Sequence, residues 1–385
     1  MNKLLTYFKG IGVLELMVAL FPIVAGYDVW SLIWCVLMII YAFTRKPVAY
    51  FRDIILLLCF GFVLLHSIAV MLINNFDSTM FNQIVGKTIY LFTIIFVTRY
   101  VSYQKLLPSL LLVGVIVCIG LVYQLVLILA GHTVSPIPLP FLPSPDLDSR
   151  LYAEMGRPSS FFWEPASFVA FTMLPLFLCL VERKVALAVF FFLCILLSTS
   201  SNGIFMAPVM MAVYVLTSKA KVKNKFWVLC GLIAVAIVFF QTNIFDIGKE
   251  KIDNTDFSDN VRLANGPALV SQMPISDLVT GITDTEVDKY LSSHSLQGML
   301  SSSGGFFLSD FWYVLVVYGI VGLILHLLVY FHLLKLDRTL LPYIVVLLIA
   351  QFTQSVSFRS MYVFQMICIW TYVLYNKKQQ IINHV

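Results

Sequence analysis

The sequence predicts an all-α integral membrane protein with about twelve transmembrane helices, for two reasons. First, 60% of its 385 residues are hydrophobic and 12% are charged, whereas soluble domains contain roughly 45–50% apolar and 25% charged residues. Second, the apolar residues form long runs separated by charge clusters, the pattern of helical spans and not of barrel strands. This composition excludes a secreted disulfide-linked module, a cytosolic enzyme and a disordered scaffold.

The apolar runs define the candidate spans of a single polytopic membrane domain that covers residues 1–385. Some runs are shorter than the about 20 residues that cross a bilayer, so the count stays open by one pair. In chain order the runs are 10–26, 29–43, 53–74, 84–98, 106–130, 162–181, 185–200, 203–217, 226–245, 309–334, 340–355 and 361–375.

Basic residues set the expected orientation of the spans. With the N-terminus inside, most of the 25 Lys and Arg residues fall in inner loops, while most acidic residues fall on the outer side or at its boundary. This is the positive-inside pattern, and it predicts that both termini are cytoplasmic. The net charge of +5 therefore orients the chain in the membrane and gives no reason to expect a nucleic-acid partner.

Two predicted loops are long, and both fall on the outer side. The loop 131–161 is rich in proline, so we expect an extended conformation. The loop 246–308 contains Thr283 followed by Glu286, a capping box that predicts a helix start. That helix would place His294 on an apolar stripe that faces protein or membrane.

Three arginines lie on the outer side, contrary to the positive-inside pattern, and are candidate phosphate ligands. Arg157 precedes the sixth span, Arg262 lies in the large loop, and Arg359 lies in the polar turn between the last two spans. A guanidinium group offers a rigid fork of donors suited to phosphate oxygens and keeps its charge. Together these arginines would suit a lipid-linked diphosphate. The alternative for each is a headgroup contact or a local carboxylate partner.

Glu164 and His294 are the candidate catalytic residues. Glu164 stands directly before Pro165, at the expected start of a helix, where a carboxylate and a proline both favour helix initiation. Capping and catalysis are both open for Glu164. His294 is either a hydrogen-bonded core histidine or a general base, because its pKa lies near the working pH.

No metal and no cofactor are expected. The seven cysteines fall inside apolar runs, as small buried hydrophobic residues do. Asp146 and Asp148 have the spacing of a metal-binding pair, but they lie in the middle of a proline-rich loop and away from any span. The sequence therefore predicts metal-independent chemistry in which arginines supply the positive charge.

Three segments together resemble the O-antigen polymerase and ligase superfamily of bacterial membrane proteins. Arg157–Ser167 (RPSSFFWEPAS) is similar to the arginine-to-Glu-Pro-Ser stretch of polysaccharide polymerases. Arg262 followed by Gly281 is similar to the arginine and later glycine of the large periplasmic loop in that superfamily. His294, followed by a span that opens with Val317–Gly322 (VYGIVG), is similar to its His-Asn and Gly-Ile-x-Gly pattern.

The resemblance implies a Wzy-like polymerase with the fold of C-type glycosyltransferases, in the bacterial cytoplasmic (inner) membrane with its active site on the periplasmic face. Such enzymes join undecaprenyl-pyrophosphate-linked repeat units into O-antigen or capsular polysaccharide and release undecaprenyl pyrophosphate. Arg157, Arg262 and Arg359 would bind the pyrophosphate, and His294 or Glu164 would act as base. The implied partners are lipid-linked donor and acceptor glycans, membrane lipid and a chain-length regulator protein.

Two other functions stay open. An O-antigen ligase of the same superfamily would transfer a finished chain to the lipid A core. A lipid-linked-oligosaccharide flippase or other transporter would need polar groups near the membrane midplane. The deep parts of the predicted spans contain few such groups, mainly Glu15, His66, Gln124 and His326.

Overall fold

The fold consists of helices throughout the residues that the structure describes. These are, in a computed structural model, residues 10–27, 29–51, 53–73, 78–140, 142, 157–218, 261–282, 308–354 and 356–384. This part of the chain contains 13 α-helices and one short 3-10 helix, and no strand is found in it. The predicted all-α class is therefore confirmed for the described residues.

The chain divides into two compact units, each assembled from segments that are distant in sequence. The first unit consists of Met1–Lys46, Val101–Asn254 and Thr339–Val346. The second consists of Pro47–Tyr100, Thr255–Arg338 and Leu347–Val385. The short 3-10 helix Arg338–Leu340 and helix α17 (Leu341–Thr353) cross from one set of segments to the other.

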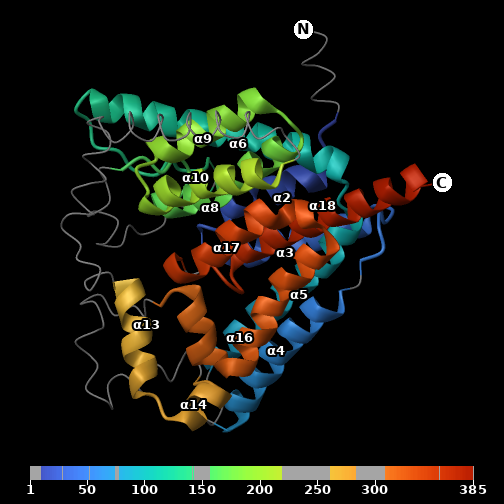
Figure 1. The fold of residues 1–385 in the computed structure, drawn as a ribbon, viewed down its shortest axis with the longest axis vertical. Coiled ribbons are helices and arrows are strands. Elements are labelled where there is room, and N and C mark those ends of the chain that lie inside the picture. The colour runs from blue at the N-terminus through green and yellow to red at the C-terminus, as the bar shows by residue number, and fades with distance from the viewer. Residues whose placement is uncertain are drawn as a thin grey trace. The chain divides into compact units, whose positions relative to one another are not determined.

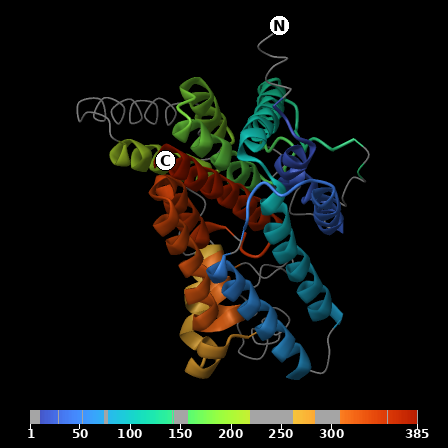
Figure 2. The same ribbon diagram turned by 90° about the vertical axis from the view of Figure 1, so that its right-hand side faces the viewer.

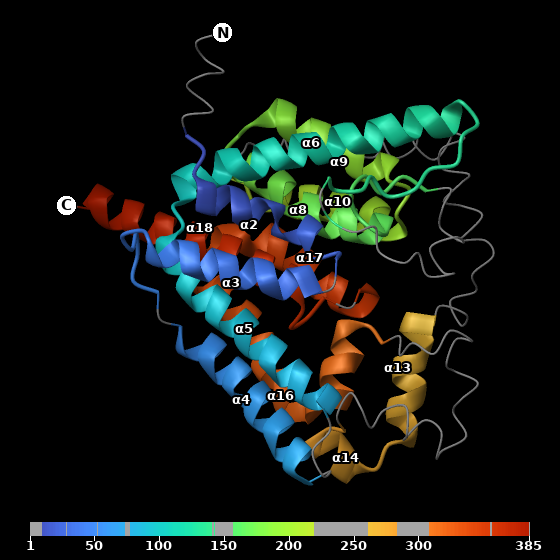
Figure 3. The same cartoon turned by 180° about the vertical axis from the view of Figure 1, so that it is seen from behind.

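Apolar helices pack directly on one another in the first unit. Its helices are α2 (Val13–Val24), α3 (Val29–Phe43), α6 (Tyr103–Leu129), α8 (Pro165–Val181), α9 (Val185–Leu197) and α10 (Ser201–Thr217). α2 packs against both α3 and α6 (Figure 3). α8, α9 and α10 contact one another and lie side by side (Figure 1). A helix satisfies its own backbone groups, which lets such apolar sequences sit in lipid.

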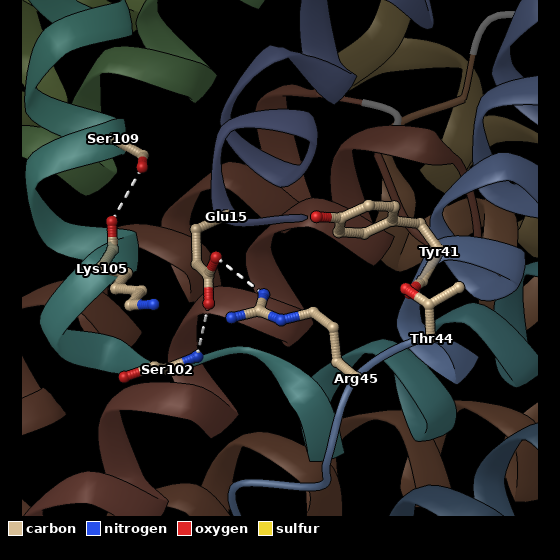
Figure 4. A network of polar contacts seen from close by, with 7 residues as sticks. All are labelled: Glu15, Tyr41, Thr44, Arg45, Ser102, Lys105 and Ser109. Carbon is tan, nitrogen blue, oxygen red and sulfur yellow. Dashed lines mark hydrogen bonds and ion pairs between the residues drawn. The ribbon is translucent and has the colours of Figure 1, made fainter. Parts of the chain in front are cut away.

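A buried carboxylate joins three helix ends of the first unit (Figure 4). Glu15 near the start of α2 is fully buried. Its Oε2 accepts a hydrogen bond from Nη1 of Arg45, just after α3, at 2.9 Å. Its Oε1 accepts from the backbone N–H of Ser102, just before α6, at 3.0 Å. A buried charge is stable only when it is paired in this way, so Glu15 holds these helix ends together.

The second unit contains longer helices. They are α4 (Ile54–Ile73), α5 (Ser78–Tyr100), α13 (Val261–Gln272), α14 (Ile275–Thr280), α16 (Asp310–Leu336) and α18 (Ser360–His384). α4 packs against α5 and α16, and α5 packs against α18. The short helices α13 and α14 lie beside α16, as the gold and orange ribbons of Figure 2 show. The predicted large outer loop therefore contains two helices that the sequence did not predict.

Helix α16 is bent sharply at Gly319, where the backbone has φ 65° and ψ −176° (Figure 1). The corresponding predicted span, 309–334, had no such break. A positive φ is available to glycine without steric cost, which explains the residue at this position. α16 is thus two helical pieces, one before and one after Gly319.

Four helices are long and apolar enough to cross a membrane, which confirms only part of the predicted count. They are Ile54–Ile73, Phe81–Tyr100, Tyr103–Leu129 and Asp310–Leu336. Six shorter apolar helices, of 10–17 residues each, coincide with other predicted spans. At 1.5 Å per residue such helices rise by at most roughly 26 Å, less than a hydrocarbon core of about 30 Å. The apolar helices indicate a multi-pass membrane protein.

Most predicted spans coincide with helices, and the differences lie at the ends. The span 84–98 starts earlier, at Ser78, and the span 361–375 extends to His384. Polar residues are frequent in both extensions, and the second also contains two lysines, so an apolar pattern alone does not assign these residues to a helix. The predicted span 226–245 and the predicted helix after Thr283 lie outside the described residues.

Within each unit, polar contacts join helix ends that the predicted topology places on the same side. In the first unit the Tyr103 hydroxyl at the start of α6 donates to Glu182, just after α8, at 2.7 Å. In the second unit His332 near the end of α16 contacts Asp53, just before α4, at 2.8 Å. The ends of α6 and α8 and the ends of α16 and α4 thus lie together as the predicted topology has them, while the orientation of the spans in the membrane stays a prediction.

Candidate functional site

Arg157 is anchored to a helix–helix turn of the first unit. Its Nη2 donates to the backbone carbonyl of Thr199 at 2.7 Å, and its Nε lies 3.5 Å from the Thr199 hydroxyl. Thr199 lies between α9 and α10, so the arginine is held directly at the start of α10. A helix start carries positive charge from unpaired N–H groups. Arg157 and this helix end therefore add to the same positive potential.

The segment that carries Arg157 is held against α6 by one glutamine. Oε1 of Gln124 accepts from the backbone N–H groups of Ser159 and Ser160, at 2.9 and 2.6 Å. Its Nε2 donates to the carbonyls of Ser135 and Ser160, at 2.7 and 3.3 Å. The Ser160 hydroxyl donates to the Val117 carbonyl at 2.7 Å. Gln124, named from the sequence only as a deep polar residue, thus fixes the backbone that precedes α8.

Glu164 is the N-cap residue of α8, as its position before Pro165 predicted. Its backbone is extended, and Pro165 is the first residue of the helix. The Ser167 hydroxyl donates to the Glu164 carboxylate at 3.3 Å, and in the described chain this carboxylate caps no backbone N–H of the helix. Glu164 therefore marks the helix start without being a side-chain cap, and its half-buried carboxylate stays a candidate for chemistry.

Arg359 lies in a turn of the second unit that Asp310 organises. Oδ1 of Asp310, at the start of α16, accepts from the backbone N–H groups of Val356 and Ser357, at 2.7 and 2.8 Å. The Asp310 N–H donates to the Gln354 carbonyl at 2.7 Å. Arg359 is exposed, interacts electrostatically with Asp310, and lies with its guanidinium 6.0 Å from the ring centroid of Tyr313. Asp310 thus holds the backbone of the turn that carries this exposed cation.

Backbone strain accompanies both arginines. Ser160, Thr199 and Phe358 adopt φ values of 58°, 54° and 59°, in the left-handed region that non-glycine residues rarely enter. Each such residue costs of the order of 1–3 kcal/mol, and strain of this kind gathers at functional sites. Thr199 is the anchor of Arg157, Ser160 lies three residues after Arg157, and Phe358 directly precedes Arg359. Arg183, outside the candidate site, has a similar φ of 55°, and it lies just after the end of a helix, as Thr199 does, where a left-handed residue is common.

A buried polar network connects this turn to α16 within the second unit. Nε2 of His326 lies 2.9 Å from Oε1 of Gln351 and 3.1 Å from the Ser357 hydroxyl. Nε2 of Gln351 donates to the Tyr330 hydroxyl at 3.1 Å. These side chains are buried, so the network ties the Arg359 turn to the second half of α16.

The break in α16 lies against the end of α14. Gly281 follows α14 with φ 80°, and a Cβ on it would lie 2.5 Å from the Val317 carbonyl oxygen. A Cβ on Gly319 would overlap the Val279 carbonyl oxygen. The Val316 carbonyl, whose helical partner would be the N–H of Ile320, accepts from the Ile282 N–H at 2.8 Å. Two glycines allow the backbones of a loop and a broken helix to meet.

A histidine and a lysine from two other helices reach this break. Nε2 of His66 in α4 lies 2.6 Å from the Thr280 carbonyl oxygen. The His66 ring packs edge-on against Tyr318, with ring centroids 5.6 Å apart. Nζ of Lys87 in α5 lies 5.1 Å from the Tyr318 ring centroid and is buried. Two basic side chains, those of His66 and Lys87, therefore lie next to Tyr318 at the break.

The predicted site residues divide between the two units. Arg157 and Glu164 belong to the first unit, at the two ends of the short segment before α8. Arg359 belongs to the second unit, and Arg262 is the second residue of α13 in that unit. His294, Asp146 and Asp148 lie outside the described residues. Among the residues that are described, no three His, Cys, Asp or Glu side chains are grouped as a metal site would require.

Sequence reasoning assigned no role to Asp310, Lys87 or His66. His66 and Lys87 are ionisable residues within helices that are long and apolar enough to span a membrane, a signal that by itself points to function. Asp310 gives no comparable signal, because an acidic residue at a helix start is common. Its role depends on a turn 46 residues later in the chain.

No protein-family model matches the chain, and no curated protein matches it.

Proposed function

We propose that the chain is a Wzy-like polysaccharide polymerase that joins undecaprenyl-pyrophosphate-linked repeat units into O-antigen or capsular polysaccharide. It would act in the bacterial cytoplasmic membrane, with its site on the periplasmic face. The observation that carries the proposal is the contact between Gly281 and Gly319. Each glycine belongs to a segment that resembles the superfamily, and each has a positive φ at the point where the two backbones meet.

Two arginines, one in each unit, are the candidates for the contacts to the diphosphate leaving group. Arg157 is anchored on the Thr199 carbonyl, and Arg359 on a turn held by Asp310. Preorganised cations stabilise developing negative charge without reorganising during the reaction, which is the largest contribution in many enzymes. Arg262 would add a third positive charge from α13.

The proposed reaction is a glycosyl transfer. The acceptor hydroxyl oxygen bonds to the anomeric carbon of the donor while the bond from that carbon to the pyrophosphate oxygen breaks. The bonding electrons leave with undecaprenyl pyrophosphate, whose charge Arg157, Arg262 and Arg359 would offset. The hydroxyl proton passes to a base, for which His294 and Glu164 are the candidates from the sequence. No metal is required, because the arginines carry the positive charge.

Purified protein with a synthetic lipid-linked repeat unit tests the proposal. We expect a ladder of products that differ by one repeat unit, formed equally well with and without a chelator. A ladder that chelator abolishes would contradict the metal-independent mechanism. Absence of any ladder from folded protein would contradict the polymerase itself. A chain-length regulator protein, added in a second reaction, should narrow the distribution of product lengths.

An O-antigen ligase is the alternative within the same superfamily. A strain that lacks the protein separates the two activities. Single repeat units that remain on the lipid anchor indicate a missing polymerase, whereas long chains that are not attached to the lipid A core indicate a missing ligase. We expect single units.

One observation favours a transporter as the alternative from another class. α16 is interrupted at Gly319, and the ionisable residues His66, Lys87 and His326 lie within the long apolar helices. Broken helices with buried polar groups are typical of secondary transporters. Proteoliposomes loaded with a labelled lipid-linked glycan distinguish the two functions, because a transporter moves the label across the bilayer without lengthening any glycan.

A further inference from the structure

His66 is held in one orientation by a backbone carbonyl. Its Nε2 lies 2.6 Å from the Thr280 carbonyl oxygen, and a carbonyl oxygen only accepts hydrogen bonds. Nε2 therefore carries the proton in the neutral ring, and Nδ1 carries the lone pair. A histidine whose one nitrogen is fixed by a carbonyl presents the other in a defined direction, as general bases require.

Nδ1 of His66 has no hydrogen-bond partner in the described chain, although this atom is buried. A buried polar atom without a partner costs about 1–3 kcal/mol, and Nδ1 of His66 is one of twelve such side-chain atoms among the described residues. Catalysis provides an explanation for Nδ1 of His66, since a substrate hydroxyl would be the missing donor.

The surroundings of His66 suit a transfer between a hydroxyl and an anionic leaving group. The His66 ring contacts Tyr318, and Lys87 lies over the same tyrosine with Nζ 5.1 Å from the ring centroid. His66, a proton acceptor, and Lys87, a cation, thus both contact the ring of Tyr318. His66 lies seven residues before the end of α4, which is roughly 10 Å below that helix end.

We propose that His66 is the general base that accepts the proton of the acceptor hydroxyl. This inference rests on the proposed polymerase function and assigns its base to the break of α16. The hydroxyl O–H bond breaks as its oxygen bonds to the anomeric carbon, and the proton moves to Nδ1. The bond from the anomeric carbon to the pyrophosphate breaks with its electron pair, and the imidazolium then releases the proton to water.

The variant His66→Gln separates catalysis from structure. The glutamine amide is able to donate to the Thr280 carbonyl as Nε2 of His66 does, so the contact between α4 and α14 is retained. Glutamine has no basic nitrogen, so it cannot accept the proton. The matched control is His132→Gln, because His132 is exposed just after α6 and belongs to no contact described above.

The measurement is the rate of ladder formation by purified variants from pH 5 to pH 9. We expect His66→Gln to lower kcat by roughly 100-fold or more, with KM little changed, and to remove the fall of the rate at acid pH. His132→Gln should match the unchanged protein. Equal thermal unfolding midpoints would show that both variants are folded.

Two results would overturn the assignment of His66. One is a kcat for His66→Gln within about 3-fold of the unchanged protein; the other is a change confined to KM. In either case the unchanged protein still forms a ladder, so the polymerase function stands and only the base is wrong. If the unchanged protein forms no ladder, the proposed function itself fails.

Discussion

At the residue scale, two arginines lie outside the helices, in segments that groups distant in sequence hold in place. Arg157 depends on the Thr199 carbonyl in the turn between α9 and α10. Arg359 depends on a turn whose backbone donates to Asp310 at the start of α16. The Thr199 carbonyl is a backbone group, and Asp310 accepts hydrogen bonds from backbone N–H groups. Substitution of either arginine therefore leaves these groups in place. Variants at these positions therefore report on chemistry more than on folding.

We expect Arg359→Ala to abolish long polymer while the amount of protein in the membrane stays normal. Removal of one preorganised charge at such a site costs about 10²–10³ in rate. The readout is the length of polysaccharide made by cells that carry each variant. Arg338→Ala is the control, because Arg338 is exposed on the side predicted to be cytoplasmic. Polymer of ordinary length from Arg359→Ala would refute this site assignment.

At the element scale, one segment and one helix depart from straight apolar helices. The segment before α8 is tied to α6 through Gln124. Helix α16 is broken where α14 meets it. Irregular backbone at membrane depth is stable only where protein or a cavity satisfies its polar groups. The segment before α8 and the break in α16 are therefore each stabilised by identified residues, and these residues can be mutated.

Gln124→Leu should destabilise the protein by about 1–3 kcal/mol, because the N–H groups of Ser159 and Ser160 lose their buried acceptor. The same change should shorten the polymer, since the displaced segment carries Arg157. The unfolding midpoint of detergent-solubilised protein measures the first effect. Gln104→Leu is the control on the same helix, at an exposed position. Equal midpoints for both variants would show that the Gln124 contacts contribute nothing.

Gly319→Ala should cost stability and activity together. The backbone of Gly319, with φ 65° and ψ −176°, costs a non-glycine residue roughly 1–3 kcal/mol, and the new Cβ would overlap the Val279 carbonyl oxygen. Gly61→Ala is the matched control in α4, since a Cβ there meets no atom within 4 Å. It should leave stability unchanged or raise it by up to about 1 kcal/mol. If Gly319→Ala behaved like Gly61→Ala, the break in α16 would not depend on glycine.

At the scale of the whole molecule, the exposed apolar side chains of the long helices indicate a membrane protein. Described residues with large exposed apolar side chains include Leu65, Leu72 and Ile73 of α4, which are 69%, 73% and 76% exposed. Exposed leucine and isoleucine in such number are stable against lipid tails and unstable against water. The exposed apolar faces of the long helices therefore suit contact with lipid.

The predicted orientation is tested by cysteine labelling in intact cells. The six described cysteines are buried, so they should react little with a membrane-impermeant maleimide. We expect His132→Cys to react in intact cells, because it lies on the predicted outer side, and Lys335→Cys to react only after the membrane is opened. Both positions are exposed. The reverse pattern would invert the topology and move the arginines to the cytoplasmic face.

The composition and the spacing of charges by themselves determined the all-α class and the positions of most helices, because lipid demands long apolar helical runs. They also singled out Arg157, Glu164 and Arg359 and the start of α8 at Pro165. They did not reveal the break at Gly319 or the parts played by Gln124, Asp310 and His66. Each of these depends on a hydrogen bond or a close approach between segments distant in sequence, which apolar periodicity does not record. Only the tertiary structure decided which carbonyl orients His66, because that carbonyl belongs to a residue 214 positions away.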